Sequence, residues 1–280
     1  MSTFITISVQ QKDKDFIEHG FKIFKDIDFS LSSYNKNSPI YRLNRDKKSK
    51  INNYTYEAFV QSKKFYKDTD SYFNISIGSI TKDLYHFGED DRVASRDELK
   101  EARIDFDEVY FTKDEAKLGK SIKVDLGGMG KGFGVDKAAA YFRANSVEAT
   151  ISASGDIRCL DVCTFDIRNP FGDGALASFI TTKKDLGIST SGNYVRFVKS
   201  KANNHLINPK TKKSQTIFVS ITLISELSSS ALDAYTTASS VMPMKKAYEF
   251  LDSLELAYVI LQSDGKLKVS SNISDYALKK

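Results

Sequence analysis

The chain has 280 residues, of which 41% are hydrophobic and 12% aromatic, so it can bury a substantial core and is not a strongly disordered protein. Its net charge is +5, but the lysines are scattered in pairs such as Lys63-Lys64 and Lys212-Lys213, a pattern typical of solvated faces, and no nucleic-acid groove is expected. The longest apolar stretches, such as 217–224, are far too short to span a bilayer, and the start of the chain lacks the basic residues and apolar run of a signal peptide.

The first part of the chain predicts one strand and two helices. Residues 3–9 are β-branched and aromatic, which is typical of a strand. Apolar residues recur at helical spacing over 12–29, and a second amphipathic helix is predicted over 55–68. The polar segment 86–104 gives no clear element.

The rest of the chain alternates strands with helices. Strands are predicted at 107–112, 121–126, 148–152, 156–168, 176–182, 217–224 and 257–263. With no linker and no repeat, this order predicts one compact α+β domain over 1–280, with mixed or antiparallel sheets and packed helices. Two lobes, at about 1–120 and 121–280, are expected within it.

Three helices are predicted in this second part. The first follows a glycine-rich stretch, and its inner face would carry Val135, Ala138, Ala139 and Phe142. The next begins near Ser228, where a run of serines offers N-cap hydroxyls. Pro243 then breaks or kinks it, and a further helix runs to about Leu254.

Cys159 and Cys163 are the two cysteines of the chain. They lie four apart in the predicted strand 156–168, on one face but too far apart to bridge, so both are expected to be apolar packing residues. A zinc site would need more Cys or His nearby, and the whole chain has three histidines.

The stretch VDLGGMGKGFGVD, 124–136, holds five of the fifteen glycines. It does not fit a Walker loop, because Gly132 stands where Ser or Thr should follow Lys131, and it lacks the third glycine of a dinucleotide fingerprint. Backbone N–H groups in such a turn, at a helix start and beside a lysine, form an anion site. The alternative is a closely packed turn between a strand and a helix.

Four later segments combine small polar residues with acids or a histidine. These are ISASGDI (151–157), GISTSGNYVRF (187–197, with a polar turn at 190–192), NHLINPKT (204–211) and SSALDAYTTASSVMP (229–243). In the last, Asp233 and Thr237 stand at i and i+4 of a helix, where a carboxylate and a hydroxyl suit Mg²⁺. The alternative is an Asp that favours the helix dipole and a surface Thr one turn later.

Taken in order, these segments resemble the FAD:protein FMN transferases, the ApbE family. The family patterns D-L-G-G-I-A-K-G-Y-x-x-D, G-G-D-I, T-S-G-D-Y-x-R, H-I-I-D-P-x-T-G and A-D-A-x-[AS]-T-A are similar to 125–136, 154–157, 190–196, 205–211 and 232–238. SPIYRLN (38–44) and SYFNISIG (71–78) also resemble family motifs, so the likeness spans nearly the whole chain.

The sequence departs from these patterns at several positions. Asn74, Asn193 and Asn208 stand where the family has aspartates, and Gly130 replaces its usual alanine. Ser154 replaces a glycine, and Lys212 stands where a glycine would follow Thr211. An Asp-to-Asn change keeps the shape and an acceptor but removes a charge.

The resemblance implies a flavin transferase architecture, similar to the T-fold, and a site assembled from several motifs. It implies FAD as substrate, with its pyrophosphate over the turn at 127–134, and Mg²⁺ as cofactor. Residues expected to contact the flavin nucleotide are Met1, Tyr34, Tyr72, Phe73, Asn74, Gly128, Lys131, His205 and Ile207. The metal ligands implied are Gly130, through its carbonyl, Asp233 and Thr237; Asp233 and His205 would be the catalytic residues.

The implied reaction is transfer of FMN from FAD to a threonine hydroxyl of a target protein, with release of AMP. Two alternatives remain: an FAD pyrophosphatase that uses water, and a catalytically weak FAD-binding protein, which the three asparagines suggest. The resemblance implies action in the periplasm or at the outer face of the cytoplasmic membrane, with membrane contact only through a lipid anchor missing from this chain. A cytoplasmic variant is the alternative.

Overall fold

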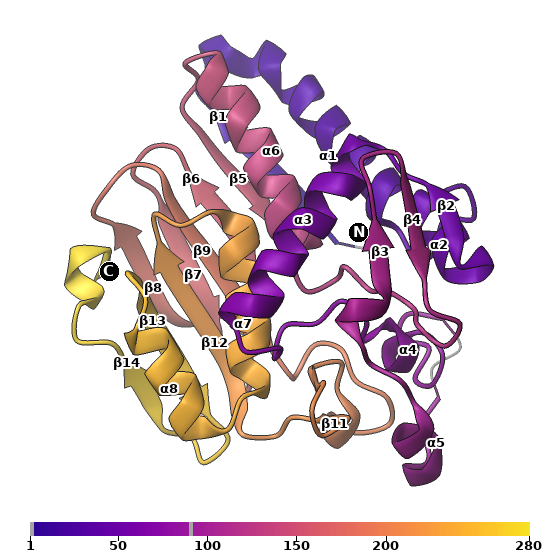
Figure 1. The fold of residues 1–280 in the computed structure, drawn as a ribbon. Coiled ribbons are helices and arrows are strands. Elements are labelled where there is room, and N and C mark those ends of the chain that lie inside the picture. The colour runs from indigo at the N-terminus through magenta and orange to yellow at the C-terminus, as the bar shows by residue number, and fades with distance from the viewer. Residues whose placement is uncertain (1–2, 90–91) are drawn as a thin grey trace.

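A seven-stranded sheet forms the centre of the computed structural model, which describes residues 3–89 and 92–280 (Figure 1). Its strands run in the order β1-β5-β6-β9-β12-β13-β14, and each neighbouring pair is antiparallel. Their bounds are β1 Ile5–Val9, β5 Ala149–Ala153, β6 Asp156–Cys159, β9 Leu186–Gly192, β12 Phe218–Ser225, β13 Ala257–Gln262 and β14 Leu267–Val269. Because β1 pairs with β5, the start of the chain belongs to the same sheet as its second half; the division into two lobes stays a prediction.

Helices cover one face of this sheet and a second sheet covers the other (Figure 1). The helices are α1 (Ile17–Leu31), α6 (Gly130–Ala144), α7 (Ser229–Val241) and α8 (Met244–Asp252). The second sheet, in the order β15-β8-β7, consists of β7 (Thr164–Arg168), β8 (Ala175–Thr181) and β15 (Ala277–Lys279). The interior strand β12 is therefore buried along its whole length: Ile221 and Leu223 face the helices, and Ile224 faces the small sheet.

The remaining elements lie before α6 in the chain, apart from two short strands in a later loop. They are α2 (Pro39–Asp46), β2 (Lys48–Lys50), α3 (Asn53–Asp68), α4 (Gly78–Thr81), α5 (Arg96–Glu101), β3 (Val109–Phe111) and β4 (Glu115–Leu118), with β10 (Ile207–Asn208) and β11 (Lys213–Ser214) in the later loop. Short 3-10 turns at Gln11–Phe16, Phe106–Glu108, Lys201–Asn203 and Ile273–Asp275 complete the chain. The strands β2, β4 and β3 form a third antiparallel sheet, in which β3 is an edge.

The predicted helices are confirmed. The Asn52 side chain caps α3 by accepting from the Thr55 N–H at 3.0 Å. All four residues predicted for the inner face of α6 are fully buried. Pro243 lies between α7 and α8, as expected of a residue that cannot continue a helix. Across residues 3–89 and 92–280, no helix has both the length and the apolar character that a membrane span requires.

One strand prediction and one turn prediction are wrong. Residues 121–126 form no strand; a single bridge from Lys123 to Ile77 is their one ladder contact in the described chain. The polar turn predicted at 190–192 is instead the end of β9, because Thr190 and Thr222 face each other across the sheet and share a hydrogen bond of 2.9 Å. The small hydroxyl residues at 190–192 favour a turn when the sequence is considered alone, but a paired strand also accommodates them.

The prediction that Cys159 and Cys163 stay unpaired is also wrong. The stretch 156–168 is two strands, β6 and β7, and the chain turns between them. The turn brings the two Cα atoms to 5.9 Å, where about 13 Å would separate them along one strand, and the cysteines form a disulfide.

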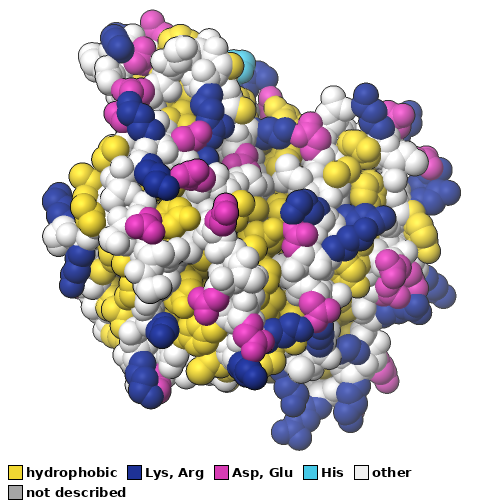
Figure 2. All heavy atoms as spheres, turned by 60° about the vertical axis from the view of Figure 1, so that its left-hand side comes forward, with side chains coloured by type: hydrophobic (Ala, Val, Ile, Leu, Met, Phe, Trp, Pro, Cys, Tyr) yellow, Lys and Arg dark blue, Asp and Glu magenta, His cyan; other side chains and the backbone are white. Residues whose placement is uncertain are grey.

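Charges of both signs are interspersed over the face shown in Figure 2. This distribution agrees with the scattered lysine pairs of the sequence.

Candidate functional site

The glycine-rich turn allows α6 to meet α7 at close range. A Cβ at Gly132 would lie 2.2 Å from the Ser229 carbonyl oxygen, so only glycine fits there. The Asp136 carboxylate accepts from the Ser229 N–H at 2.7 Å and the Ser230 N–H at 2.9 Å. One turn of α6 thus caps the start of α7, and the two helices are fixed relative to each other.

Lys131 lies at the centre of the site. Its ammonium donates to both oxygens of Asp233, at 2.9 and 3.0 Å, and lies 2.8 Å from Oδ2 of Asp156. The Gly132 N–H donates to Asp233 Oδ2 at 3.1 Å. These residues come from α6, α7 and β6, so contacts between distant segments create the cluster.

Both carboxylates of this cluster are nearly inaccessible, at 1% exposure for the Asp156 side chain and 2% for that of Asp233. Burial, with Asp233 nearby, raises the pKa of Asp156 above its ordinary value. Burial lowers the pKa of Lys131, but the two carboxylates outweigh it and the net shift is upward. Lys131 is therefore held as a cation between two acidic groups.

A chain of hydroxyl groups on β9 and α7 holds the Asp156 carboxylate in place. Ser189 donates to Asp156 Oδ1 at 2.5 Å and lies 3.3 Å from the Thr236 hydroxyl. Ser191 donates to Thr236 at 3.1 Å, and Thr236 donates to the Asp233 carbonyl at 2.9 Å. This network joins β9 to α7 and holds both carboxylates in place.

Thr237 lies one turn after Asp233 on α7, as predicted, and faces the glycine turn. Its hydroxyl donates to the Gly128 carbonyl at 3.3 Å. A Cβ at Gly128 would lie 3.1 Å from the Thr237 methyl group and 3.3 Å from the Phe73 ring. The structure therefore brings Gly128, Phe73 and Thr237 together, whereas the Gly130 N–H opens α6 by donating to the Leu126 carbonyl at 2.8 Å.

This donor set fits a hard divalent cation. When both carboxylates are ionised, two negative groups face one ammonium and leave a net charge of −1, and the Lys131 ammonium at 2.8 Å is the one partner of Asp156 Oδ2 among the described residues. The Thr237 hydroxyl and the carbonyls of the turn add further oxygens, the ligands that Mg²⁺ prefers. Within the described ranges, no three His, Cys, Asp or Glu side chains converge on a point that could hold a metal, so such an ion would also need water or phosphate oxygens.

A second polar cluster lies at the other end of the turn, around Asp125. Thr81 donates to Asp125 Oδ2 at 2.7 Å, and the Lys82 ammonium lies 3.6 Å from the same oxygen. Lys82 and Arg196 both donate to the Tyr34 hydroxyl, at 2.5 and 2.7 Å. Tyr34 is thus held by its hydroxyl, with Lys82 4.0 Å from its ring centre.

His205 joins this second cluster through Arg196. Its Nδ1 lies 3.0 Å from the Arg196 carbonyl oxygen, and because a carbonyl can only accept, Nδ1 carries the proton and Nε2 the lone pair. Burial lowers the pKa of His205 to about 4, helped by the charges of Arg196 and Lys131. The imidazole is therefore neutral at pH 7 and can accept a hydrogen bond at Nε2.

Two further predicted flavin contacts are buried in different surroundings. The Tyr72 ring lies under the ammonium groups of Lys210 and Lys246, at 4.2 and 5.1 Å from its centre. Both lysines pair with Asp70. Ile207 packs in a separate apolar cluster with Ile80 and Phe87. Met1 lies outside the described residues, so its predicted contact with the flavin stays a prediction.

Two of the three asparagines that replace family aspartates hold turns. Asn74 Oδ1 accepts from the Ser76 N–H at 2.9 Å, a role that an aspartate would also fill. The Asn208 amide donates to the Val241 carbonyl at 2.6 Å, a bond that a carboxylate could not make. The Asn193 N–H donates to the Val219 carbonyl at 3.1 Å, and its side chain is buried.

Sequence reasoning missed several residues that the structure places in the site. Asp125, Asp156, Ser189 and Arg196 all stand in the quoted motifs, but the sequence pattern assigns no role to any of them. Its place in the motif SGDI was the available signal for Asp156. No pattern in the neighbouring sequence identifies Lys82 as a site residue, because only the folded chain brings it close to Asp125.

Comparisons with known proteins place this chain among flavin transferases. Residues 1–260 match the model of the ApbE family. Two proteins named FAD:protein FMN transferase, from Haemophilus influenzae and Treponema pallidum, are 25% and 26% identical, covering 89% and 92% of this chain and 79% and 80% of their own. The solved ApbE protein of Thermotoga maritima superposes with a TM-score of 0.85 at 22% identity, covering 98% of this chain and 96% of its own. The flavin transferase ApbE of Vibrio cholerae gives 0.82 at 19%, covering 99% and 96%, so the predicted α+β flavin transferase fold is confirmed.

Proposed function

The chain belongs to the ApbE family, and on that premise we propose that it transfers FMN from FAD to a hydroxyl group of a target protein. Similarity to proteins named FAD:protein FMN transferase over about nine-tenths of the chain supports this proposal. The observation that carries it is the Lys131 cluster, a cation between two buried carboxylates at a glycine-rich helix start.

The proposed acceptor group is a threonine hydroxyl. Its oxygen forms a bond to the FMN phosphorus of FAD, and the bond from that phosphorus to the AMP oxygen breaks. The hydroxyl proton passes to water or to the departing AMP phosphate, and AMP departs with the bonding electron pair, so the products are a phosphoester-linked flavin and free AMP. Phosphoryl transfer of this kind depends on positioning and on neutralising charge rather than on covalent help from the protein.

The residues of the chain divide that work. Lys131, at the glycine-rich start of α6, binds the negative pyrophosphate. Asp156 and Asp233 hold Lys131 in one place, and the chain of hydroxyl groups from Ser189 holds Asp156. His205, neutral and with its lone pair at Nε2, orients a donor such as the acceptor hydroxyl or a flavin N–H.

Asp233 and Thr237 would hold Mg²⁺, together with carbonyl oxygens of the glycine turn such as that of Gly128 and the predicted ligand Gly130. When bound, the ion would act as a Lewis acid that offsets negative charge on the phosphates. The Lys131 cluster carries a net charge of −1 when both carboxylates are ionised, and this supports the assignment.

The experiment that tests the proposal follows AMP release from FAD by chromatography. A purified acceptor domain with its threonine is compared with the same domain carrying Thr→Ala, each with Mg²⁺, with EDTA, and with Mg²⁺ restored. Release that needs both the threonine and the metal supports the transferase. Equal release with the alanine acceptor would instead indicate a pyrophosphatase, and bound FAD without any AMP would indicate a binding protein.

We also propose that the protein acts in the periplasm or at the outer face of the cytoplasmic membrane. The Cys159–Cys163 disulfide supports an oxidising compartment. Alkylation of intact cells, with and without prior reduction, tests this. Labelling of the two thiols without reductant would contradict it and favour the cytoplasm.

A further inference from the structure

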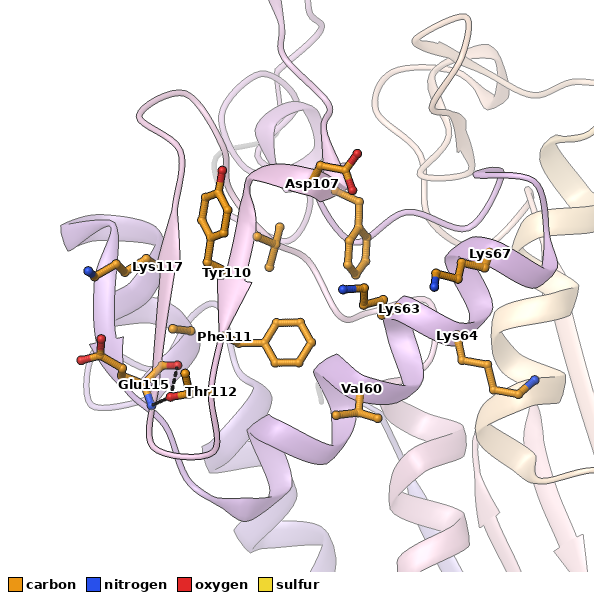
Figure 3. A pocket seen from close by; sticks show the side chains of 13 residues that line it. Val60, Lys63, Lys64, Lys67, Asp107, Tyr110, Phe111, Thr112, Glu115 and Lys117 are labelled. Carbon is orange, nitrogen blue, oxygen red and sulfur yellow. Dashed lines mark hydrogen bonds between the residues drawn. The ribbon is translucent and has the colours of Figure 1, made fainter.

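A groove of about 870 Å³ lies between α3 and the hairpin β3–β4 (Figure 3). It shares no lining residue with the Lys131 cluster or with the Asp125 cluster. Its apolar part includes Val60, Phe106 and Phe111, and Val60 is 45% exposed. Figure 3 shows Lys63 and the Phe111 ring pointing into the space between the helix and β3. The groove thus combines an apolar base with charged walls.

One wall of the groove is an open strand edge. β3 pairs with β4 on one side, and no strand of the described chain pairs with its other side. Thr112 donates to the Glu115 carbonyl at 2.8 Å and Gly119 donates to the Glu108 carbonyl at 3.0 Å, so the even-numbered residues face β4. By alternation the N–H and C=O of Phe111 point outward, unpaired, along the groove.

The opposite wall is a row of lysines. Val60, Lys63, Lys64 and Lys67 recur at i, i+3, i+4 and i+7 on the exposed face of α3. Lys64 pairs with Asp68 at 2.5 Å, whereas no hydrogen bond or ion pair joins the ammonium of Lys63 or Lys67 to a described residue.

Positive charge predominates over the whole lining. With Lys117 the groove has four lysines against two carboxylates, Asp107 and Glu115, and Lys48 pairs with Glu115 at 2.9 Å. The groove lining therefore carries a net positive charge that a ligand could pair with.

We propose that this groove binds an extended acidic segment of a partner protein, which adds as a strand to the free edge of β3. Backbone hydrogen bonds to Phe111 would give affinity, and acidic side chains would pair with Lys63 and Lys67. Apolar side chains on the same segment would cover Val60. The proposal does not depend on the transferase activity, because none of these residues belongs to the proposed site.

The lysines also bear on whether this edge pairs with a second copy of the chain. Lysines beside an edge strand discourage pairing with a second copy of this chain, because the second copy carries the same positive charges. They do not discourage an acidic strand. The same charges therefore select for one kind of partner and against self-association.

The test uses the full chain and a fluorescent nine-residue peptide that alternates valine with glutamate. Fluorescence anisotropy should show saturable binding, and the double variant Lys63→Glu/Lys67→Glu should weaken it about tenfold, as expected when two exposed attractive pairs become repulsive. Hydrogen exchange at the Phe111 amide should slow by about tenfold or more on binding. The matched control Lys12→Glu/Lys14→Glu makes the same change in net charge on an exposed segment elsewhere and should bind as the wild type does.

Three results would overturn the proposal. Equal weakening in both double variants would mean that only net charge matters. Binding without slower exchange at Phe111 would rule out strand addition. Displacement of the peptide by a single-stranded oligonucleotide that itself binds more tightly would mean that the groove is a nucleic-acid surface.

Discussion

Replacement of Gly132 by alanine tests how the site is built. The new Cβ would lie 2.2 Å from the Ser229 carbonyl oxygen, 2.5 Å from its carbon and 2.8 Å from the Ser230 nitrogen. These are backbone atoms of α7 and cannot rotate away, whereas ordinary contacts need at least 3.4 Å. The two helices must therefore separate by roughly 1 Å at the point where the Gly132 N–H meets Asp233.

The expected cost has two parts. Overpacking of this kind costs about 1–3 kcal/mol. A strained or lost hydrogen bond to a buried carboxylate adds about 1.5–3 kcal/mol. Alanine regains about 0.5–1 kcal/mol as the better helix former. The net loss in the free energy of unfolding is then about 2–5 kcal/mol.

Urea unfolding followed by circular dichroism measures this loss. The matched control is Gly130→Ala, whose Cβ would meet only Leu31 Cδ1, at an ordinary 3.8 Å. It should be as stable as the wild type or slightly more stable. Equal stability of the two alanine variants would refute the close contact between α6 and α7, and with it this description of the site.

Three further substitutions test other parts of the account. Asp156→Asn removes a desolvated carboxylate from a cluster in which two carboxylates face one ammonium. The free energy of unfolding in urea at pH 7 should stay unchanged or rise by about 1 kcal/mol, while Mg²⁺-dependent AMP release falls at least tenfold. A loss of stability above ~2 kcal/mol would contradict the claim that the cluster has one carboxylate in excess. His205→Asn keeps a donor to the Arg196 carbonyl but does not titrate. Since the folded pKa of His205 is about 4 against an ordinary 6.5, the wild type should lose up to ~3 kcal/mol more stability than the variant as pH falls from 6.5 to 4. Parallel pH profiles of the two proteins would contradict the low pKa. Asn208→Asp removes the donor to the Val241 carbonyl, so the free energy of unfolding, measured by thermal unfolding, should fall by about 1–2 kcal/mol while AMP release stays the same. A gain in AMP release would show instead that the asparagine weakens the enzyme.

The sequence predicted those elements whose signals are local. Helical spacing identified α3 and α6, and the i, i+4 relation placed Asp233 and Thr237 on one face of α7. The end of β9 was missed because its residues are small and polar, and their pairing partners on β12 lie about thirty positions away. The turn that closes the disulfide was missed because Cys159–Cys163 contains neither Gly nor Pro.

The chemistry of the site was harder to predict than its location. Lys131 and Asp233 are about a hundred residues apart, and no pattern near either of them reveals that they touch. The role of Asp156 depends on that contact and on the hydroxyl of Ser189, so it emerges only in the folded chain. The asparagines that replace family aspartates suggested a loss of function when only the motif was considered. In the structure, the Asn208 amide makes a hydrogen bond that an aspartate could not make.

The most direct test of the central claim is the intact mass of an acceptor domain after incubation with this protein, FAD and Mg²⁺. The account predicts one FMN phosphoester per acceptor threonine and an equal amount of AMP. Asp233→Asn, shown to be folded by circular dichroism, should abolish both, because it removes the carboxylate that holds Lys131 and would hold the metal. An acceptor fully modified by the Asp233→Asn variant, or AMP released without any modified acceptor, would contradict it.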